Sequence, residues 1–196
     1  PGGGAGPRSR RLVAAPGIHG EKGLGGHAWP EPPVAPVPEH GVDLIIDLVL
    51  AAPGEITLVP TGPVTNIALA LRKEPRIASR VREVVLMGGA WSRGNMTPAA
   101  EFNTYVDPEA AAIVFGGGWP VTMIGLEVTE QAVATEGVFE RIDAVATPVA
   151  KAVSGMLRFY QAQQQREIGI VAPPVHDPCA VARVARPGLV ETRDAY

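Results

Sequence analysis

Short apolar runs that alternate with helix-forming segments constrain this chain more than any other feature of its sequence. Three of these runs are typical of buried strands and lie at residues 56–59, 81–87 and 120–126. Segments with helical spacing or helix-end signals separate and flank them, at residues 42–52, 65–72 and 110–115. Because buried strands that alternate with helices form parallel sheets covered on both faces, we expect an α/β fold with a largely parallel sheet.

Residues that begin and end helices support these bounds. The segment from Val42 to Ala52 stops at Pro53-Gly54, a pair that ends helices. Asp107-Pro108-Glu109 places an N-cap residue, a proline and an acid at the start of the next helix. We expect one or two amphipathic helices over residues 136–168, where apolar side chains recur at spacings of three and four: Val149, Val153, Met156, Leu157 and Tyr160.

Residues 1–40 differ in composition from the rest of the chain. Glycine and proline are frequent there, which disfavours long helices and central strands and predicts a surface loop. Long loops in compact proteins are either functional lids or disordered linkers, and the sequence leaves both open. We therefore expect one domain over residues 1–196, with this loop region at 1–40 and an α/β core at 41–196.

Composition excludes several classes of protein. Hydrophobic residues make up 46% of the chain and charged residues 19%, which suits a folded domain with a substantial core. The net charge of −3 comes without a dense basic block, so a nucleic-acid partner is not expected. The longest apolar stretches are too short to cross a bilayer, so no membrane span is expected. Cys179 is the single cysteine, which excludes an internal disulfide and favours the cytoplasm.

In open parallel sheets, ligands bind beyond the carboxyl ends of the strands. The segments to inspect are therefore the turns at residues 60–63, 88–103, 127–130 and 173–177. The densest polar group among them runs from Gly94 to Asn103 and contains Asn95 and Glu101. Amides and a carboxylate can bind the vicinal hydroxyls of a sugar, and Glu101 and Asn103 would share a face if the stretch were extended. Composition alone favours an ordinary loop whose side chains satisfy backbone groups.

Two further groups carry titratable side chains. In His176-Asp177-Pro178, the aspartate can bind a hard cation and the histidine can act as an acid near neutral pH. The same residues can also form a helix N-cap with proline at the first helical position, and the two roles are compatible. His19 lies in a glycine-rich stretch that could fold over a ligand or be a mobile surface loop. The glycine spacing matches no phosphate-binding motif.

Taken together, four stretches resemble the inosine-uridine type nucleoside hydrolases, a calcium-dependent family that cuts the N-glycosidic bond of ribonucleosides. Their order and spacing carry the resemblance, which extends from about Gly17 onward. They are Ile56 to Ala68, Glu83 to Gly89, Glu101-Phe102-Asn103 leading to Asp107 to Ala111, and Val175 to Pro178. The resemblance implies part of a Rossmann-like fold, a role in purine or pyrimidine salvage, and a homodimer or homotetramer.

The resemblance also implies roles for individual residues. The backbone carbonyl of Thr61 and the carboxylate of Asp177 would bind Ca²⁺, which prefers oxygen ligands. His176 would protonate the departing base. The nucleoside would be bound by the remaining residues of the set, which are Met87, Asn95, Glu101, Asn103 and, near the base, His19.

The sequence departs from the family pattern in one respect. Members begin with an Asp-Thr-Asp-x-Gly-x-Asp-Asp motif that supplies further calcium ligands and the general base, and these 196 residues do not contain it. We therefore expect a piece of a ribonucleoside hydrolase, truncated at both ends and weak or inactive alone. The alternatives are a degenerate nucleoside- or ribose-binding protein without turnover, and a fragment that binds neither.

Overall fold

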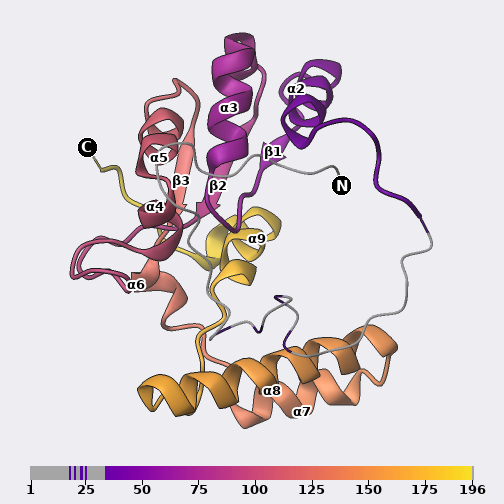
Figure 1. Ribbon diagram of the computed structural model, residues 1–196, viewed down its shortest axis with the longest axis vertical. Helices are drawn as coiled ribbons and strands as arrows, with labels where there is room; N and C mark the ends of the chain where they lie inside the picture. Colours follow the sequence, from indigo (N-terminus) through magenta and orange to yellow (C-terminus); the bar gives the residue numbers. More distant parts are fainter. Residues whose placement is uncertain (1–17, 19, 21–22, 24, 26–33, 196) are drawn as a thin grey trace. The chain divides into compact units, whose positions relative to one another are not determined.

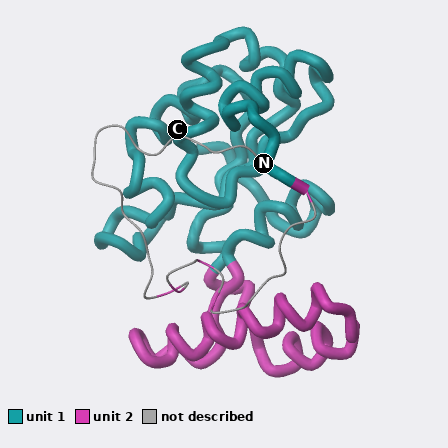
Figure 2. Tube along the Cα trace, turned by 45° about the vertical axis from the view of Figure 1, so that its right-hand side comes forward, with its two compact units in different colours: residues 1–12, 35–129, 176–196 teal, residues 13–34, 130–175 magenta. Residues whose placement is uncertain are grey.

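The computed structural model describes residues 18, 20, 23, 25 and 34–195. His19 and most of the expected N-terminal loop lie outside these residues. Two compact units are present, one of residues 1–12, 35–129 and 176–196 and the other of residues 13–34 and 130–175 (Figure 2). The first unit contains the sheet and the second contains a pair of helices. The single domain expected from the sequence stays a prediction.

Within the described residues, the sheet of the first unit has three parallel strands in the order β1-β2-β3 (Figure 1). They are β1 (Thr57–Leu58), β2 (Glu83–Met87) and β3 (Val121–Ile124). The carboxyl ends of parallel strands meet at one edge, so the segments that follow β1, β2 and β3 are neighbours there. The predicted parallel α/β arrangement is confirmed.

Strand β1 is shorter than the four-residue run that predicts it. Hydrogen bonds nevertheless continue beyond both of its ends: the Arg82 N–H donates to the Ile56 carbonyl at 2.8 Å, and the Met87 N–H donates to the Pro60 carbonyl at 3.0 Å. Pro60 is thereby held against the last residue of β2. The turn after β1 consequently begins at the same edge of the sheet as the loop after β2.

The two faces of the sheet carry separate apolar clusters. Along β2, Val84 and Leu86 belong to one cluster, and Val85 and Met87 belong to the other, as the alternation of side chains in a strand requires. Both clusters are covered by helices, which explains why the strand is apolar from Val84 to Met87. Near-continuous apolar sequence is therefore the mark of a strand buried on both sides.

Helices α2, α3 and α5 contribute to the first cluster together with the short helix η1, and α9 contributes to the second together with the short helix α6. Figure 1 shows α3 between α2 and α5. Helix α9 contacts β2 on the other side through the fully buried Ala180. The bounds are α2 (Gly41–Ala51), α3 (Thr65–Lys73), α5 (Pro108–Phe115) and α9 (Asp177–Ala185). Short helices join them: η1 (Pro75–Ser79), α4 (Phe102–Val106), α6 (Leu126–Thr129) and η2 (Pro187–Leu189).

The start of α5 confirms the predicted cap. Asp107 accepts the Ala110 N–H at 3.1 Å with one carboxylate oxygen, and the other accepts the Thr65 hydroxyl at 2.5 Å. Thr65 and Asp107 are both buried, at 5% exposure each. The cap therefore also joins the first turn of α3 to the first turn of α5.

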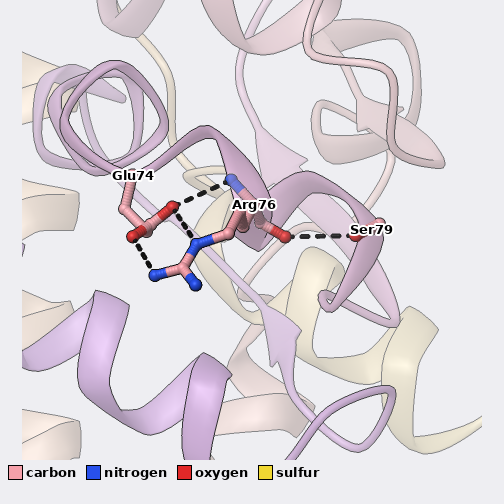
Figure 3. A network of polar contacts seen from close by, with 3 residues as sticks. All are labelled: Glu74, Arg76 and Ser79. Atoms are coloured by element: carbon pink, nitrogen blue, oxygen red, sulfur yellow. Dashed lines mark hydrogen bonds and ion pairs between the residues drawn. The ribbon is translucent and has the colours of Figure 1, made fainter.

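The carboxylate of Glu74 organises the C-terminal end of α3. Glu74 accepts the Arg76 N–H at 3.1 Å and two guanidinium N–H groups of Arg76 at 2.8 and 2.7 Å (Figure 3). The hydroxyl of Ser79 donates to the Arg76 carbonyl at 3.2 Å. Hydrogen bonds from Arg76 lower the pKa of Glu74 from 4.5 to about 2. The network lies at the surface and begins η1.

The second unit contains α7 (Glu136–Ala144) and α8 (Pro148–Ile168). Phe139 of α7 is fully buried, and the guanidinium of Arg158 lies 4.3 Å from the centre of its ring. Gly25 lies so close to Phe159 that a Cβ atom there would be 3.2 Å from the phenylalanine side chain. This close approach explains one glycine of the glycine-rich stretch.

The one or two amphipathic helices expected over residues 136–168 are two, α7 and α8, but one position of the predicted apolar face is wrong. Val149, which the spacing assigns to the apolar face of α8, is 65% exposed, and the next residue, Ala150, is buried instead. The helix turns small side chains inward in its first two turns, Ala150, Ala152 and Ser154. In the part of the chain that the structure describes, no helix combines the length and apolar character needed to cross a membrane.

Candidate active site

Glu101 organises the segment that follows β2. Its side chain is only 3% exposed, and it occupies the N-cap position of α4. The carboxylate accepts the N–H groups of Asn103 at 2.9 Å, Thr104 at 3.2 Å and Gly89 at 2.8 Å. The extended conformation considered for residues 101–103 is therefore wrong, because this capping holds the residues after Glu101 in a helix.

The helix still brings Glu101 and Asn103 to the same place. The amide nitrogen of Asn103 donates to the Met87 carbonyl at 3.1 Å and lies 3.4 Å from the Met87 sulfur. Glu101 accepts a hydrogen bond from Gly89, two residues beyond Met87. Three residues that the sequence predicts to bind substrate thus gather at the carboxyl end of β2.

Asn95 belongs to the same segment and is tied to the start of α4. Its side-chain oxygen accepts the Phe102 N–H at 2.9 Å. The loop around it is closed by backbone bonds, with Gly94 N–H donating to the Pro98 carbonyl at 3.1 Å. Gly94 has no room for a side chain, since a Cβ atom there would lie 2.2 Å from the Ala100 carbonyl oxygen. Asn95 is therefore carried on a compact loop with many internal bonds.

Thr61 follows β1 at the same edge of the sheet. The preceding carbonyl, that of Pro60, accepts the Met87 N–H at 3.0 Å, which fixes the backbone one residue before Thr61. The residue itself is exposed. Its predicted role needs only its backbone carbonyl.

His176 and Asp177 stand at the start of α9, which packs on β2. The helix begins at Asp177 with proline in its first turn, so His176 occupies the N-cap position, one residue earlier than the sequence suggested, and its side chain forms no cap. Instead, the Nδ1 atom of His176 lies 2.7 Å from the hydroxyl of Thr129, which is fully buried. The ring is thus held from the segment that follows β3.

Sequence reasoning selected the segment 127–130 but assigned no residue in it. Glu127 accepts with a single oxygen the N–H groups of Trp91 at 2.8 Å and Ser92 at 2.7 Å, and the Ser92 hydroxyl at 2.9 Å. Burial raises the pKa of the Glu127 carboxyl, but hydrogen bonds from Ser92, from its own backbone N–H and from Trp91 together outweigh burial and hold that pKa below its usual value. An acid in the first turn after a strand is the only sequence signal of this residue.

The carboxylate, amides and imidazole at this edge can make hydrogen bonds of both directions to a polyhydroxylated ligand. A carboxylate has about four acceptor positions, and the three N–H groups around Glu101 occupy three of them. One position remains for a ligand hydroxyl. A surface hollow of about 510 Å³ lies elsewhere in the first unit, lined by residues of α3, η1 and α5 that take no part in this site.

The fit to a metal ion is incomplete. No group of three or more His, Cys, Asp or Glu side chains suited to a metal occurs among the described residues. The Thr61 carbonyl and the Asp177 carboxylate would supply two oxygen atoms, whereas Ca²⁺ takes about six to eight. The described residues therefore do not form a complete calcium site.

Comparisons with known proteins agree with this geometry. The sequence model of the inosine-uridine preferring nucleoside hydrolase family matches residues 2–196. A pyrimidine-specific ribonucleoside hydrolase RihA of Shewanella sp. (strain ANA-3) is 45% identical over 196 residues, 100% of this chain and 62% of the relative. The inosine-uridine preferring nucleoside hydrolase of Crithidia fasciculata is 49% identical over 188 residues, 95% of this chain and 60% of the relative.

Solved structures give the same result. A purine-preferring ribonucleoside hydrolase from Gardnerella vaginalis superposes with a TM-score of 0.90 at 37% identity, covering 97% of this chain and 61% of the other. A plant nucleoside hydrolase gives a TM-score of 0.85 at 32% identity, over 93% of this chain and 57% of the other. The chain spans about three fifths of the length of these relatives. It belongs to the inosine-uridine preferring nucleoside hydrolase family.

Proposed function

We propose that the protein containing this chain hydrolyses the N-glycosidic bond of ribonucleosides to ribose and free base. The observation that carries the proposal is the gathering of Met87, Glu101 and Asn103 at the carboxyl end of β2, with Asn95 on the same loop. Carboxylate and amide groups suit the ribose hydroxyls. The names of the relatives specify different nucleobases: pyrimidines, inosine and uridine, or purines. The proposal therefore covers ribonucleosides as a class.

His176 is the proposed proton donor. Cleavage of the glycosidic bond leaves negative charge on the departing base and positive charge on the sugar, so protonation of the base eases the reaction. The contact with buried Thr129 supports this role, because a fixed ring can be aimed at a leaving group. The ribose contacts of Glu101 and the two asparagines would hold the sugar in place as the bond breaks.

Membership of the family points to a metal cofactor. We propose Ca²⁺, with the Thr61 carbonyl and the Asp177 carboxylate as two of its ligands, because both are oxygen donors of the kind that this ion prefers. His19 is proposed to lie near the base. We further propose a cytoplasmic homodimer or homotetramer, supported by the single cysteine for the compartment and by the resemblance for the assembly.

The absence of one sequence motif bears on the activity of these 196 residues alone and favours an alternative function. These 196 residues contain no Asp-Thr-Asp-x-Gly-x-Asp-Asp motif, which the family resemblance implies as the source of the general base and of further metal carboxylates. We accordingly propose that the 196-residue polypeptide alone turns over nucleosides weakly or not at all. A degenerate nucleoside- or ribose-binding protein without turnover is the alternative.

The test compares turnover with binding. Ribose release from inosine and from uridine is measured with the complete protein and with the 196-residue chain, each with and without Ca²⁺, and calorimetry measures binding of the same nucleosides. We expect turnover in the complete protein, and loss of about two orders of magnitude in kcat for His176→Ala. His40→Ala is the matched control, because His40 caps α2 through its Nδ1 atom and lies outside the site.

Each outcome has a definite meaning. Turnover by the complete protein that depends on His176 supports hydrolysis. Nucleoside binding without turnover in the complete protein supports the alternative and contradicts hydrolysis. If the complete protein shows no binding and no turnover, both hydrolysis and the binding-protein alternative are wrong. Rapid turnover by the 196-residue chain would contradict the expectation that this chain alone is weak or inactive.

A further inference from the structure

Helix α6 contacts two parts of the proposed site: the loop that carries Asn95 and the side chain of His176. It is a single turn that follows β3 directly, and its first and last residues, Leu126 and Thr129, are buried. The Leu126 N–H donates to the Gly89 carbonyl at 3.1 Å, and the Thr129 N–H donates to the Gly125 carbonyl at 3.2 Å. The turn is therefore fixed to the edge of the sheet where the site residues gather.

One side chain of this turn holds the loop that carries Asn95. Glu127 accepts three hydrogen bonds from Trp91 and Ser92, at the start of that loop. The far end of the loop is held by the bond from Gly89 to Glu101. Because internal bonds close the part between the two ends, movement at Ser92 would be transmitted to Asn95.

Another side chain of the same turn holds the imidazole of His176. The Thr129 hydroxyl lies 2.7 Å from the Nδ1 atom, and the threonine is fully buried. This contact fixes the plane of the ring through one nitrogen. A ring held in a fixed orientation can be aimed at the leaving base.

We propose that α6 is a positioning element that aligns the two sides of the site: Glu127 sets the Asn95 loop and Thr129 sets the His176 ring. The proposal rests on the proposed function. In this role Glu127 acts through Trp91 and Ser92, and Thr129 acts through His176. A contact to ribose contributes to the bound substrate and to the transition state alike, whereas protonation of the base contributes only in the transition state.

The two residues should therefore affect different kinetic constants. Glu127→Ala in the complete protein is expected to raise KM about tenfold with little change in kcat, since about one hydrogen bond to the ribose is misplaced. Thr129→Val, which keeps the shape and removes the hydroxyl, is expected to lower kcat about tenfold with little change in KM. Thr129→Ser, which restores a hydroxyl, should recover most of the activity.

Matched controls separate positioning from general damage. Glu74→Ala removes another carboxylate that accepts a backbone N–H, on a network outside the site, and should leave both constants unchanged (Figure 3). Hydrogen exchange at the Ser92 amide should quicken in Glu127→Ala and not in Glu74→Ala. If Glu127→Ala does not fold, Glu127→Gln serves in its place, because it keeps the volume and weakens the three bonds.

A double-mutant cycle tests whether Glu127 acts through Asn95. We expect Asn95→Ala and Glu127→Ala to be non-additive in KM, with the second change adding little once the first is made. Additive effects, or a fall in kcat and a rise in KM together in both α6 variants, would overturn the positioning role.

Turnover by the four variants distinguishes an error in the proposed function from an error in the role of α6. If Asn95→Ala and His176→Ala leave turnover unchanged, the roles proposed for those residues are wrong. If these two variants impair turnover while Glu127→Ala and Thr129→Val do not, only the role of α6 is wrong.

Discussion

Glu101 should contribute to stability as well as to any ligand binding, and Glu101→Ala separates the two. The change removes the cap of α4 and leaves the Gly89 N–H without its acceptor in a buried position. A lost N-cap costs about 1 kcal/mol. A buried N–H without a partner costs about 2 kcal/mol. We therefore expect the free energy of unfolding to fall by about 3 kcal/mol.

Urea unfolding followed by circular dichroism measures this loss. For a chain of this size, about 3 kcal/mol corresponds to a fall in Tm of about 6–12 °C. The control is Glu74→Ala, which removes one backbone and two guanidinium hydrogen bonds at the surface and should lower the Tm much less than Glu101→Ala does. A loss of less than about 1 kcal/mol for Glu101→Ala would refute the inference that its carboxylate holds the segment after β2.

Three further changes follow from packing and electrostatics. Arg158→Ala removes the cation over the Phe139 ring and two exposed ion pairs, so we expect a small fall in Tm in thermal unfolding, and an unchanged Tm would contradict that packing. Gly89→Ala should lower the free energy of unfolding by at least about 2 kcal/mol in the same assay, because Gly89 has a φ of +76° and a Cβ atom there would lie 2.5 Å from the Met123 sulfur. A wild-type melting temperature would show that the position tolerates a side chain. Arg76→Ala should return the pKa of Glu74 from about 2 toward its usual 4.5, as carbon NMR titration would show. Because the pKa in the folded state is the lower one, the stabilisation by Glu74 is complete above about pH 4.5 and is lost as the pH falls toward 2, and an unchanged titration would contradict the assigned cause.

The strands and the larger helices could be predicted from local sequence. Strand β2 lies within the predicted run and ends where Gly88-Gly89 follows, because its buried part, from Val84 to Met87, is covered on both faces and is apolar. Helix α5 begins where the Asp107-Pro108-Glu109 pattern places it, since capping depends on neighbouring residues. Signals of this kind need no knowledge of the rest of the fold.

The parts that were wrong or missed depend on contacts between distant residues. Helix α4 has only five residues, too few for a periodic pattern, and Glu101 begins it while also binding Gly89. Glu127 bonds to Ser92, 35 residues away, so nothing near it in sequence indicates that role. The contact of Thr129 with His176 spans 47 residues. Such contacts follow from the order of strands in the sheet, which a single sequence does not specify.

The resemblance assigns ligand-binding roles to residues that local reasoning placed in an ordinary loop. Asn95 is compatible with both a structural and a ligand-binding role. Its side-chain oxygen accepts the Phe102 N–H, as that of an ordinary loop residue would, and its loop follows the carboxyl end of β2. A side chain can satisfy the backbone and still present its amide nitrogen to a ligand. The two interpretations therefore differ in ligand binding, which only a bound complex distinguishes.

A crystal structure of the complete protein with Ca²⁺ and a non-hydrolysable ribonucleoside analogue tests the central claim most directly. We predict that the ribose hydroxyls lie within hydrogen-bond distance of Asn95, Glu101 and Asn103, with the ion bound by the Thr61 carbonyl and the Asp177 carboxylate. An analogue bound away from the carboxyl ends of the strands, for example in the hollow beside α3 and α5, would contradict the account.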